Sequence, residues 1–238
     1  MELRRIAQQP VASDRPLRSQ MPVMRSVRWT PTTIEKEEYM NLEKLSIIQI
    51  KKAAIIFARA MMNDDLHVFF FPDKASRFEK LKSLYEYKLN IQYRNCFATS
   101  VNLEGFAIWE APGEQHNGLS LRDVLFGFKL FWHCGISPLL KMVKYQIWAS
   151  RTRDELMEQP YWYLDVIVVN PEHQGKGFAS QLIKPILLEA EKNHQAVYLE
   201  TQNKKNIQIY EKYGFILIKE IKLPRTDIIQ YCMKKNVI

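Results

Sequence analysis

Apolar and polar residues alternate along several short stretches of the chain, and each stretch predicts a β-strand. The longest is 161–169, where the alternation would give the strand two distinct faces. One predicted face carries Tyr163, Asp165, Ile167 and Val169, and the other carries Trp162, Leu164, Val166 and Val168. Asp165 is then a carboxylate within an otherwise apolar strand. Further strands are expected at 41–45, 96–101, 105–110, 196–201, 215–220 and 227–234.

Apolar residues at helical spacing predict the helices between these strands. Residues 47–62 have this spacing and follow Ser46, a suitable N-cap. A second helix is expected to begin near Ser76, because Ser76-x-x-Glu79 is a capping-box pattern, and to end near residue 93. Residues 180–192 form an amphipathic helix after the longest strand.

Residues from about 114 to 160 predict two helices that the sheet does not need. Ser120-x-x-Asp123 indicates the start of one, which ends near Cys134, and Ser137-Pro138 indicates the start of the other. Their apolar content exceeds what one buried face needs. This inserted pair either covers a pocket, forms a dimer contact or builds a satellite core, and the sequence leaves all three open.

Length and composition indicate one globular domain. The chain has 238 residues, 47% of them hydrophobic, which is enough to bury a core. No apolar run reaches the roughly 18 residues that cross a bilayer, so we expect a soluble protein without a membrane partner, and the scattered cysteines favour a reducing, cytoplasmic compartment. Cys96, Cys134 and Cys232 are far apart and lack metal-ligand spacing, so neither a disulfide framework nor a metal site is expected.

The formal net charge of +8 is unevenly distributed. Residues 1–30 hold six arginines and only two acids, so we interpret 1–39 as a flexible basic N-terminal arm and 40–238 as the domain. Beyond the arm, basic residues mix with acids and no helix has a clustered Lys/Arg face with interleaved aromatic residues. We therefore expect no nucleic-acid partner, whereas a ligand with several phosphates would suit the charge.

A polar turn with two glycines joins the strand at 161–169 to the helix at 180–192. Gly175 and Gly177 let backbone N–H groups approach an anion at the positive end of the helix dipole. Lys176 adds a cationic side chain, and the small Ala179 lets the helix lie close to a ligand. The turn predicts a phosphate cradle, although glycine turns of this kind also occur for structural reasons alone.

Two motifs carry a resemblance to a known family. Val-x-Pro-x-x-Gln-Gly-x-Gly-x-Ala, ending at Ala179, and Asn-x-x-Asn-x-x-x-Tyr-x-x-x-Gly-Phe, starting at Asn203, resemble the acetyl-CoA-binding core of the GNAT superfamily of N-acetyltransferases. Upstream segments resemble the branch that contains puromycin N-acetyltransferase. These segments are 63–65, 71–73, Arg77 and 108–113. The resemblance implies a single mixed α/β (α+β) domain with a central, mostly antiparallel sheet of about six to seven strands, flanking helices and the inserted pair.

The resemblance also implies how acetyl-CoA, the co-substrate, would be held. Backbone N–H groups of the turn would bind the pyrophosphate, and the pantetheine arm would lie like an extra strand between 163–169 and 196–201. Asn203 or Asn206 would hold the pantetheine or cap the following helix. The expected cofactor-binding residues are Val168, Val169, Gln174, Gly175, Lys176, Gly177, Phe178, Ala179, Asn203 and Asn206.

Acetyl transfer to an amine also needs a proton donor and a base. By resemblance Tyr210 is the donor, because a phenol is still protonated at neutral pH; its alternative role is a core aromatic. Asp165, Glu200 and Glu110 are candidate bases, with Asp165 first because its strand borders the thioester. A purely structural hydrogen bond is the alternative for each, and a water chain would also serve.

We therefore predict an acetyl-CoA-dependent N-acetyltransferase that acetylates a primary amine of a small molecule without a covalent enzyme intermediate. One alternative is a protein or peptide N-acetyltransferase with the same core. Another is a non-catalytic acyl-CoA sensor. The inserted helical pair would also allow a homodimer.

Overall fold

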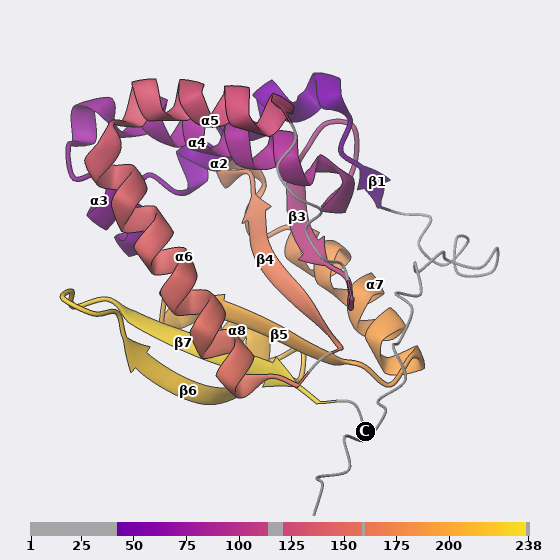
Figure 1. Ribbon diagram of the computed structural model, residues 1–238. Coiled ribbons are helices and arrows are strands. Elements are labelled where there is room, and N and C mark those ends of the chain that lie inside the picture. The colour runs from indigo at the N-terminus through magenta and orange to yellow at the C-terminus, as the bar shows by residue number, and fades with distance from the viewer. Residues whose placement is uncertain (1–41, 114–120, 159, 237–238) are drawn as a thin grey trace, which may run out of the picture.

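A seven-stranded sheet organises the part of the chain that this computed structural model describes, residues 42–113, 121–158 and 160–236. The strands are β1 (Glu43–Lys44), β2 (Cys96–Ala98), β3 (Gly105–Glu110), β4 (Tyr161–Val169), β5 (Ala196–Thr201), β6 (Ile216–Lys222) and β7 (Ile229–Lys235). Their order is β1-β2-β3-β4-β5-β7-β6, and only β4 and β5 are parallel neighbours (Figure 1). The predicted mixed α/β fold with a mostly antiparallel sheet is confirmed.

Helices cover both faces of this sheet. They are α2 (Ile50–Ala60), α3 (Asp65–Phe70), α4 (Lys74–Gln92), α5 (Leu121–Cys134), α6 (Ile136–Leu156), α7 (Phe178–Lys192) and α8 (Lys205–Glu211), with 3-10 turns at Ile47–Gln49, Tyr93–Asn95 and Pro171–His173. α2 and α4 pack together on one face, and α7 contacts β3, β4 and β5 from the other. α5 lies on α4, and α6 descends from the end of α5 toward β6 and β7 (Figure 1).

Alternating side chains of β3 supply the two main hydrophobic cores. Phe106 and Ile108 point toward α2 and α4, where they join the core around Phe57. Ala107 and Trp109 point toward α7 and join the second core. A third, smaller cluster lies near the end of α6 and contains Met157, Tyr161, Tyr198 and Cys232.

A β-bulge at Asp165 makes the predicted division of β4 into two faces wrong. Ile108 pairs with Val166 and Trp109 with Leu164, so Asp165 is an extra residue without a partner on β3. A bulge of this kind exchanges the two faces of the strand beyond it. Trp162 and Leu164 accordingly pack in the α7 core, whereas Val166 and Val168 pack in the core on the opposite face.

Several predicted element boundaries shift for local reasons. α4 begins at Lys74 because Asp73, not Ser76, is its N-cap; the Asp73 carboxylate accepts the N–H groups of Ala75 and Ser76. The sequence reading also missed α3, which is capped by Asp64. The inserted helical pair is present as α5 and α6, and α6 begins after Gly135. Residues 1–39 and Ser120 lie outside the described part of the chain.

The buried guanidinium of Arg77 ties the junction of α2, α3 and α4 together. Its Nε donates to the Phe71 carbonyl (2.6 Å), its Nη1 to that of Met62 (3.0 Å) and its Nη2 to that of Pro72 (2.8 Å). The Arg77 side chain is 5% exposed, so these carbonyls would otherwise lack a donor away from water. Arg77 therefore fixes the segment that carries α3.

We expect Arg77→Lys to lower the free energy of unfolding by about 3 kcal/mol, because one ammonium cannot replace three donors of a planar fork. Urea denaturation followed by circular dichroism measures this. Arg59→Lys, on the exposed side of α2, is the matched control and should be neutral. Equal stability of the two variants would show that the Arg77 hydrogen bonds contribute little.

Candidate active site

The parallel pairing of β4 and β5 stops halfway along the strands. Residues 161–164 pair with 196–199, whereas residues 165–169 of β4 and 200–201 of β5 have no partner across the gap between the two strands. On its other edge, β4 stays paired with β3 up to Val169. The gap therefore offers main-chain groups of β4 to a ligand, and it begins at the Asp165 bulge.

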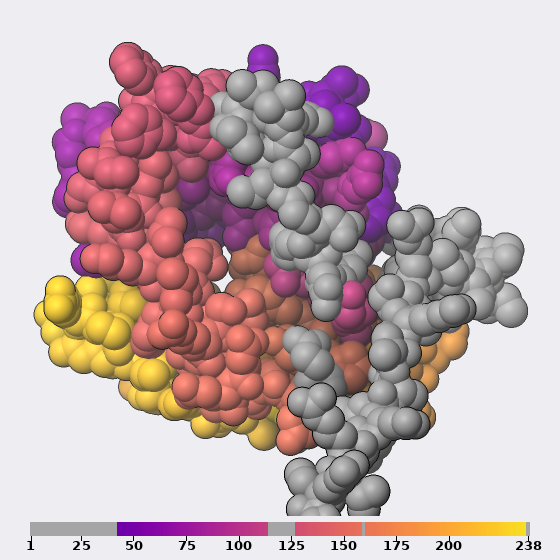
Figure 2. Space-filling model, in the orientation of Figure 1, coloured from indigo at the N-terminus to yellow at the C-terminus, as the bar shows by residue number. Residues whose placement is uncertain are grey.

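A cleft of about 2090 Å³ includes this gap. β4, the glycine turn, α7, β5 and α8 line one part of it, and α3, α4 and α6 line the other. Figure 2 shows the surface hollowed beside α6. The cleft is lined by Asp165, Val168, Val169, Gln174, Gly175, Gly177, Phe178, Ala179, Glu200, Asn203, Asn206 and Tyr210. Nearly all of the predicted site residues thus meet at one place.

The turn between β4 and α7 has the geometry of an anion cradle. Gly175 (φ +79°) and Gly177 (φ +86°) are both left-handed, and a Cβ built on either would meet no atom within 4 Å. Gly177 is the N-cap of the 15-residue α7, whose first N–H groups lack intrahelical acceptors. The side chain of Lys176 lies outside the cleft lining and donates to the carbonyl of Glu172 (3.2 Å).

Gly105 on β3 lets the start of α7 lie close to the sheet. A Cβ at this position would come within 3.2 Å of both Leu182 Cδ1 and the carbonyl oxygen of Val168. Contacts this short force neighbouring atoms to move. The absence of a side chain at Gly105 therefore sets the position of the cradle relative to β4.

The two predicted asparagines stabilise the turn between β5 and α8. Asn203 accepts the N–H of Lys205 (3.0 Å), and Asn206 Nδ2 donates to the hydroxyl of Thr201 (3.0 Å). That hydroxyl also accepts the N–H of Asn203 (3.3 Å). Asn203 thus binds the first N–H of α8, whose N-cap residue is Lys204, and Asn206 is held at the end of β5, where it lines the cleft.

Tyr210 projects from α8 into the α7 core and reaches the cleft. The residue is 7% exposed, and its ring meets that of Phe215 edge to face at 5.9 Å. Burial, and then the nearby Tyr213, raise the pKa of Tyr210 above its usual value of about 10. The phenol therefore keeps its proton throughout the physiological range.

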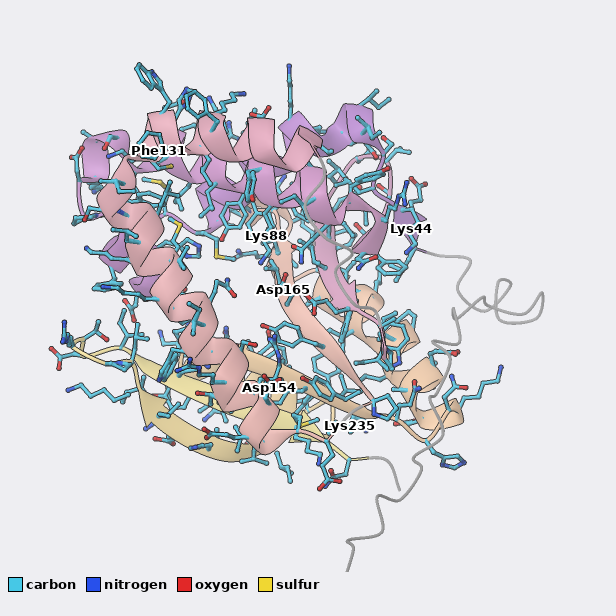
Figure 3. All side chains as sticks on the ribbon, viewed as in Figure 1. Lys44, Lys88, Phe131, Asp154, Asp165 and Lys235 are labelled. Carbon is cyan, nitrogen blue, oxygen red and sulfur yellow. The ribbon has the colours of Figure 1, made fainter. Side chains whose placement is uncertain are left out.

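Asp165 is engaged in an ion pair inside the cleft. Its Oδ1 lies 2.8 Å from Nζ of Lys88 on α4, and the two side chains point toward each other (Figure 3). Both are largely buried, with 12% of the Asp165 side chain and 22% of the Lys88 side chain exposed. The pair joins α4 to the bulge of β4.

Glu200 lies at the start of the gap between two phenols. Its Oε1 accepts the hydroxyl of Tyr198 (3.0 Å), and its Oε2 accepts that of Tyr163 (3.4 Å). Burial raises the pKa of Glu200 to about 7, although the charge of Arg153 and the hydroxyl of Tyr198 act in the opposite direction. Arg153 on α6 lies 4.0 Å from the centre of the Tyr163 ring. Glu200 can therefore exchange a proton near neutral pH.

Sequence reasoning did not select two further cleft residues, His67 and Tyr85, which join Asp64 in a chain of hydrogen bonds. Asp64-x-x-His67 is a recognisable cap pattern for a short helix. Tyr85 lies 18 residues after His67, on another helix, and no sequence pattern links the two.

Within residues 42–113, 121–158 and 160–236, no group of three or more His, Cys, Asp or Glu side chains is placed to hold a metal ion. The helices in these ranges are also too short or too polar to span a bilayer.

Part of the chain that carries these features is similar to known proteins. Residues 142–215, which contain β4, the cradle, α7, β5 and α8, match the model of the acetyltransferase (GNAT) family. The uncharacterized N-acetyltransferase C550.08 of Schizosaccharomyces pombe is 26% identical over 202 residues, covering 79% of this chain and 79% of that protein.

Solved structures share the fold. One titled histone acetyltransferase HPA2 and related acetyltransferase, from Corynebacterium glutamicum, has a TM-score of 0.57 at 18% identity and covers 83% of this chain and 96% of its own. Arylalkylamine N-acetyltransferase 2 from Aedes aegypti has a TM-score of 0.50 at 12% identity and covers 83% of this chain and 98% of its own. The likeness to the puromycin branch stays a prediction. Residues 142–215 thus carry a GNAT acetyltransferase core, and the strand, turn and helix geometry of this core agrees with that family.

Proposed function

We propose that the protein transfers an acetyl group from acetyl-CoA to a primary amine of a small molecule. The observation that carries the proposal is the single cleft that joins an anion cradle, an unpaired stretch of β4 and a protonated phenol, Tyr210. These are the three parts needed to hold a phosphate-bearing thioester and to protonate its departing sulfur.

The cradle and the gap are suited to CoA. The free N–H groups at the start of α7 and the space above Gly175 and Gly177 would accept the pyrophosphate. The unpaired main chain of β4 near Val168 and Val169 would bind the amides of the pantetheine arm, as an added strand would. Lys184 and Lys212 also line the cleft and supply positive charge for phosphates.

The polar side chains of the cleft take separate roles in proton transfer. Tyr210 gives its proton to the departing sulfur, and Glu200 takes one from the acceptor nitrogen. Asp165, held by Lys88, is proposed to orient the acceptor through its remaining oxygen rather than to act as the base. Preorganised polar groups in a site of low dielectric constant stabilise developing charge more effectively than water does.

The helical insertion favours a small acceptor. Tyr145, Ala149 and Arg153 of α6 line the cleft opposite β4, so the acceptor end has a wall on this side. A peptide acceptor would need an open groove. An acyl-CoA sensor would need neither a protonated phenol nor a carboxylate with a pKa near 7 in this cleft.

Gly177→Val tests the cradle. The substitution places a branched side chain in the open space above the turn, at a φ that valine rarely adopts, so CoA affinity should fall by about 10²-fold or more while the fold survives. Calorimetric titration with CoA measures the affinity.

Gly135→Val is the matched control for this experiment, because Gly135 has a φ of +79°, equally open space and no place in the cleft lining. It carries the same backbone strain and should bind CoA normally. If the folded Gly177→Val variant kept wild-type affinity, the turn would not be a phosphate site.

Glu200→Gln tests the base through pH. Because Glu200 must be ionised to accept a proton, kcat/KM of the wild type should rise as pH increases through about 7. The variant should show no such rise, and its rate at pH 8 should be about 10²-fold below that of the wild type.

Stability gives an independent readout of Glu200. Its folded pKa lies above the unfolded value of about 4.3, so the stabilising effect of protonation is complete below that value and is lost as pH rises through about 7. The Tm of Glu200→Gln relative to wild type should therefore increase from pH 5 to pH 8. A constant difference would show that the carboxyl is not perturbed.

A thiol-release assay with acetyl-CoA tests the function itself, using a panel of primary alkylamines, arylamines and short peptides and mass spectrometry of the products. We expect turnover with a small amine and a fall of about 10²-fold in kcat for Tyr210→Phe with unchanged CoA affinity. Tyr93→Phe, outside the cleft lining, is the control. Acetylated peptides as the only products would favour a protein or peptide N-acetyltransferase, and CoA binding without turnover would favour a non-catalytic acyl-CoA sensor.

A further inference from the structure

A buried chain of three side chains lies at the acceptor end of the cleft. Asp64, the N-cap of α3, accepts both the backbone N–H (3.1 Å) and Nδ1 (2.5 Å) of His67 through its Oδ1 atom. The other imidazole nitrogen, Nε2, lies 2.5 Å from the hydroxyl of Tyr85 on α4. All three residues line the cleft, and Tyr85 is the only one more than nine-tenths buried.

The chemistry of the three groups fixes the direction of these hydrogen bonds. An ionised carboxylate only accepts, so Nδ1 of His67 carries a hydrogen and donates it to Asp64. Burial opposes ionisation of Asp64, but the hydrogen bonds that its carboxylate accepts from His67 prevail and hold its pKa below the usual value. In the neutral imidazole Nε2 is then bare and accepts the hydroxyl hydrogen of Tyr85. Tyr85 consequently offers oxygen lone pairs to a ligand.

The surroundings hold this chain in place. The Tyr85 ring stacks on Phe57 with ring centres 3.6 Å apart, and His67 meets Phe70 edge to face. The titratable groups that face Tyr85 are Asp64 from α3, Asp165 from β4 and Tyr145 from α6, with Lys88 one turn along α4 paired to Asp165. Burial, followed by the charges of Asp64 and Asp165, raises the pKa of Tyr85 well above 10.

The reaction proposed above needs a second proton acceptor besides Glu200. A primary alkylamine, with a pKa of about 10, arrives as an ammonium ion and must lose one proton before its nitrogen can attack. When the carbon–nitrogen bond has formed, the nitrogen loses another. Per transfer, one proton is released to solvent and the other balances the proton that Tyr210 gives to sulfur.

We propose that Tyr85, with His67 and Asp64 behind it, removes the first proton from a bound alkylammonium. The ammonium gives a proton to the Tyr85 oxygen as the hydroxyl proton passes to Nε2 of His67. The products are a neutral amine and an imidazolium beside the Asp64 carboxylate, and the imidazolium later releases its proton to solvent. Glu200 takes the second proton. The inference rests on the proposed function and specifies the acceptor as an alkylamine.

In these terms Tyr85 is a catalytic residue, whereas His67 and Asp64 act through it. The phenol never needs to become phenolate, because it receives one proton as it passes on another. The same chain would have little to offer a weakly basic arylamine, which is already neutral at pH 7. A loss of rate on mutation of the chain that depends on the basicity of the amine therefore distinguishes a catalytic role from a structural one.

The test compares the best alkylamine of the panel with aniline, using Tyr85→Phe and His67→Gln. Tyr85→Phe keeps the ring that stacks on Phe57. Each of the two variants should lower kcat/KM for the alkylamine by about 10²-fold at pH 7 and should lower kcat/KM for aniline much less. Raising the pH should restore the alkylamine reaction, because neutral amine then becomes available without a base. Glu200→Gln should instead lower the rates with both amines.

Matched controls exist for both variants. His133→Gln, on the exposed part of α5, and Tyr93→Phe carry the same chemical changes outside the cleft and should behave as wild type. Equal losses with alkylamine and aniline, or a pH profile with the wild-type shape, would show that the chain is structural and overturn the inference. If wild type acetylated no amine, the proposed function itself would fail, which is a distinguishable result.

Discussion

The separation of β4 from β5 beyond residues 164 and 199 is the constraint on which the rest of the site depends. Two parallel strands that stop pairing leave main-chain donors and acceptors without partners, which is costly unless a ligand or water satisfies them. The bulge at Asp165 occurs where the pairing stops, and it turns Val166 and Val168 toward the core that contains α2 and α4. Gly105 then allows α7 to start close beside β4, so the cradle stands at the far end of the same gap.

This arrangement divides the chemistry between the two faces of the sheet. Tyr210 reaches the cleft from the α7 face, in a core that keeps its phenol protonated. Asp165, Glu200 and the chain ending in Tyr85 reach it from the side of α4 and α6. A proton donor and proton acceptors can thus approach the reacting atoms from different directions without neutralising one another. The buried ion pair of Asp165 with Lys88 fixes the distance between α4 and the bulge.

The sequence predicted most strongly where a local pattern determines the structure. β3, β4 and β5 have the predicted bounds, because alternation and apolar runs are read directly from neighbouring residues, and the two motifs located the cradle, the asparagines and Tyr210. The bulge was not predictable, because it depends on how β3 pairs with β4. The ion pair of Lys88 with Asp165 joins residues 77 positions apart, and the hydrogen bond of His67 with Tyr85 joins residues 18 positions apart. Such contacts follow only from the packing of α3 and α4.

The measurement that tests this account most directly is a crystal structure of the protein with CoA bound. The account predicts that the pantetheine arm lies in the gap between β4 and β5, bonded to the main chain near Val168, with the pyrophosphate on the N–H groups from Gln174 to Ala179 and the sulfur beside Tyr210. A complex in which CoA lies elsewhere, or in which β4 and β5 pair directly across residues 165–169, would contradict it.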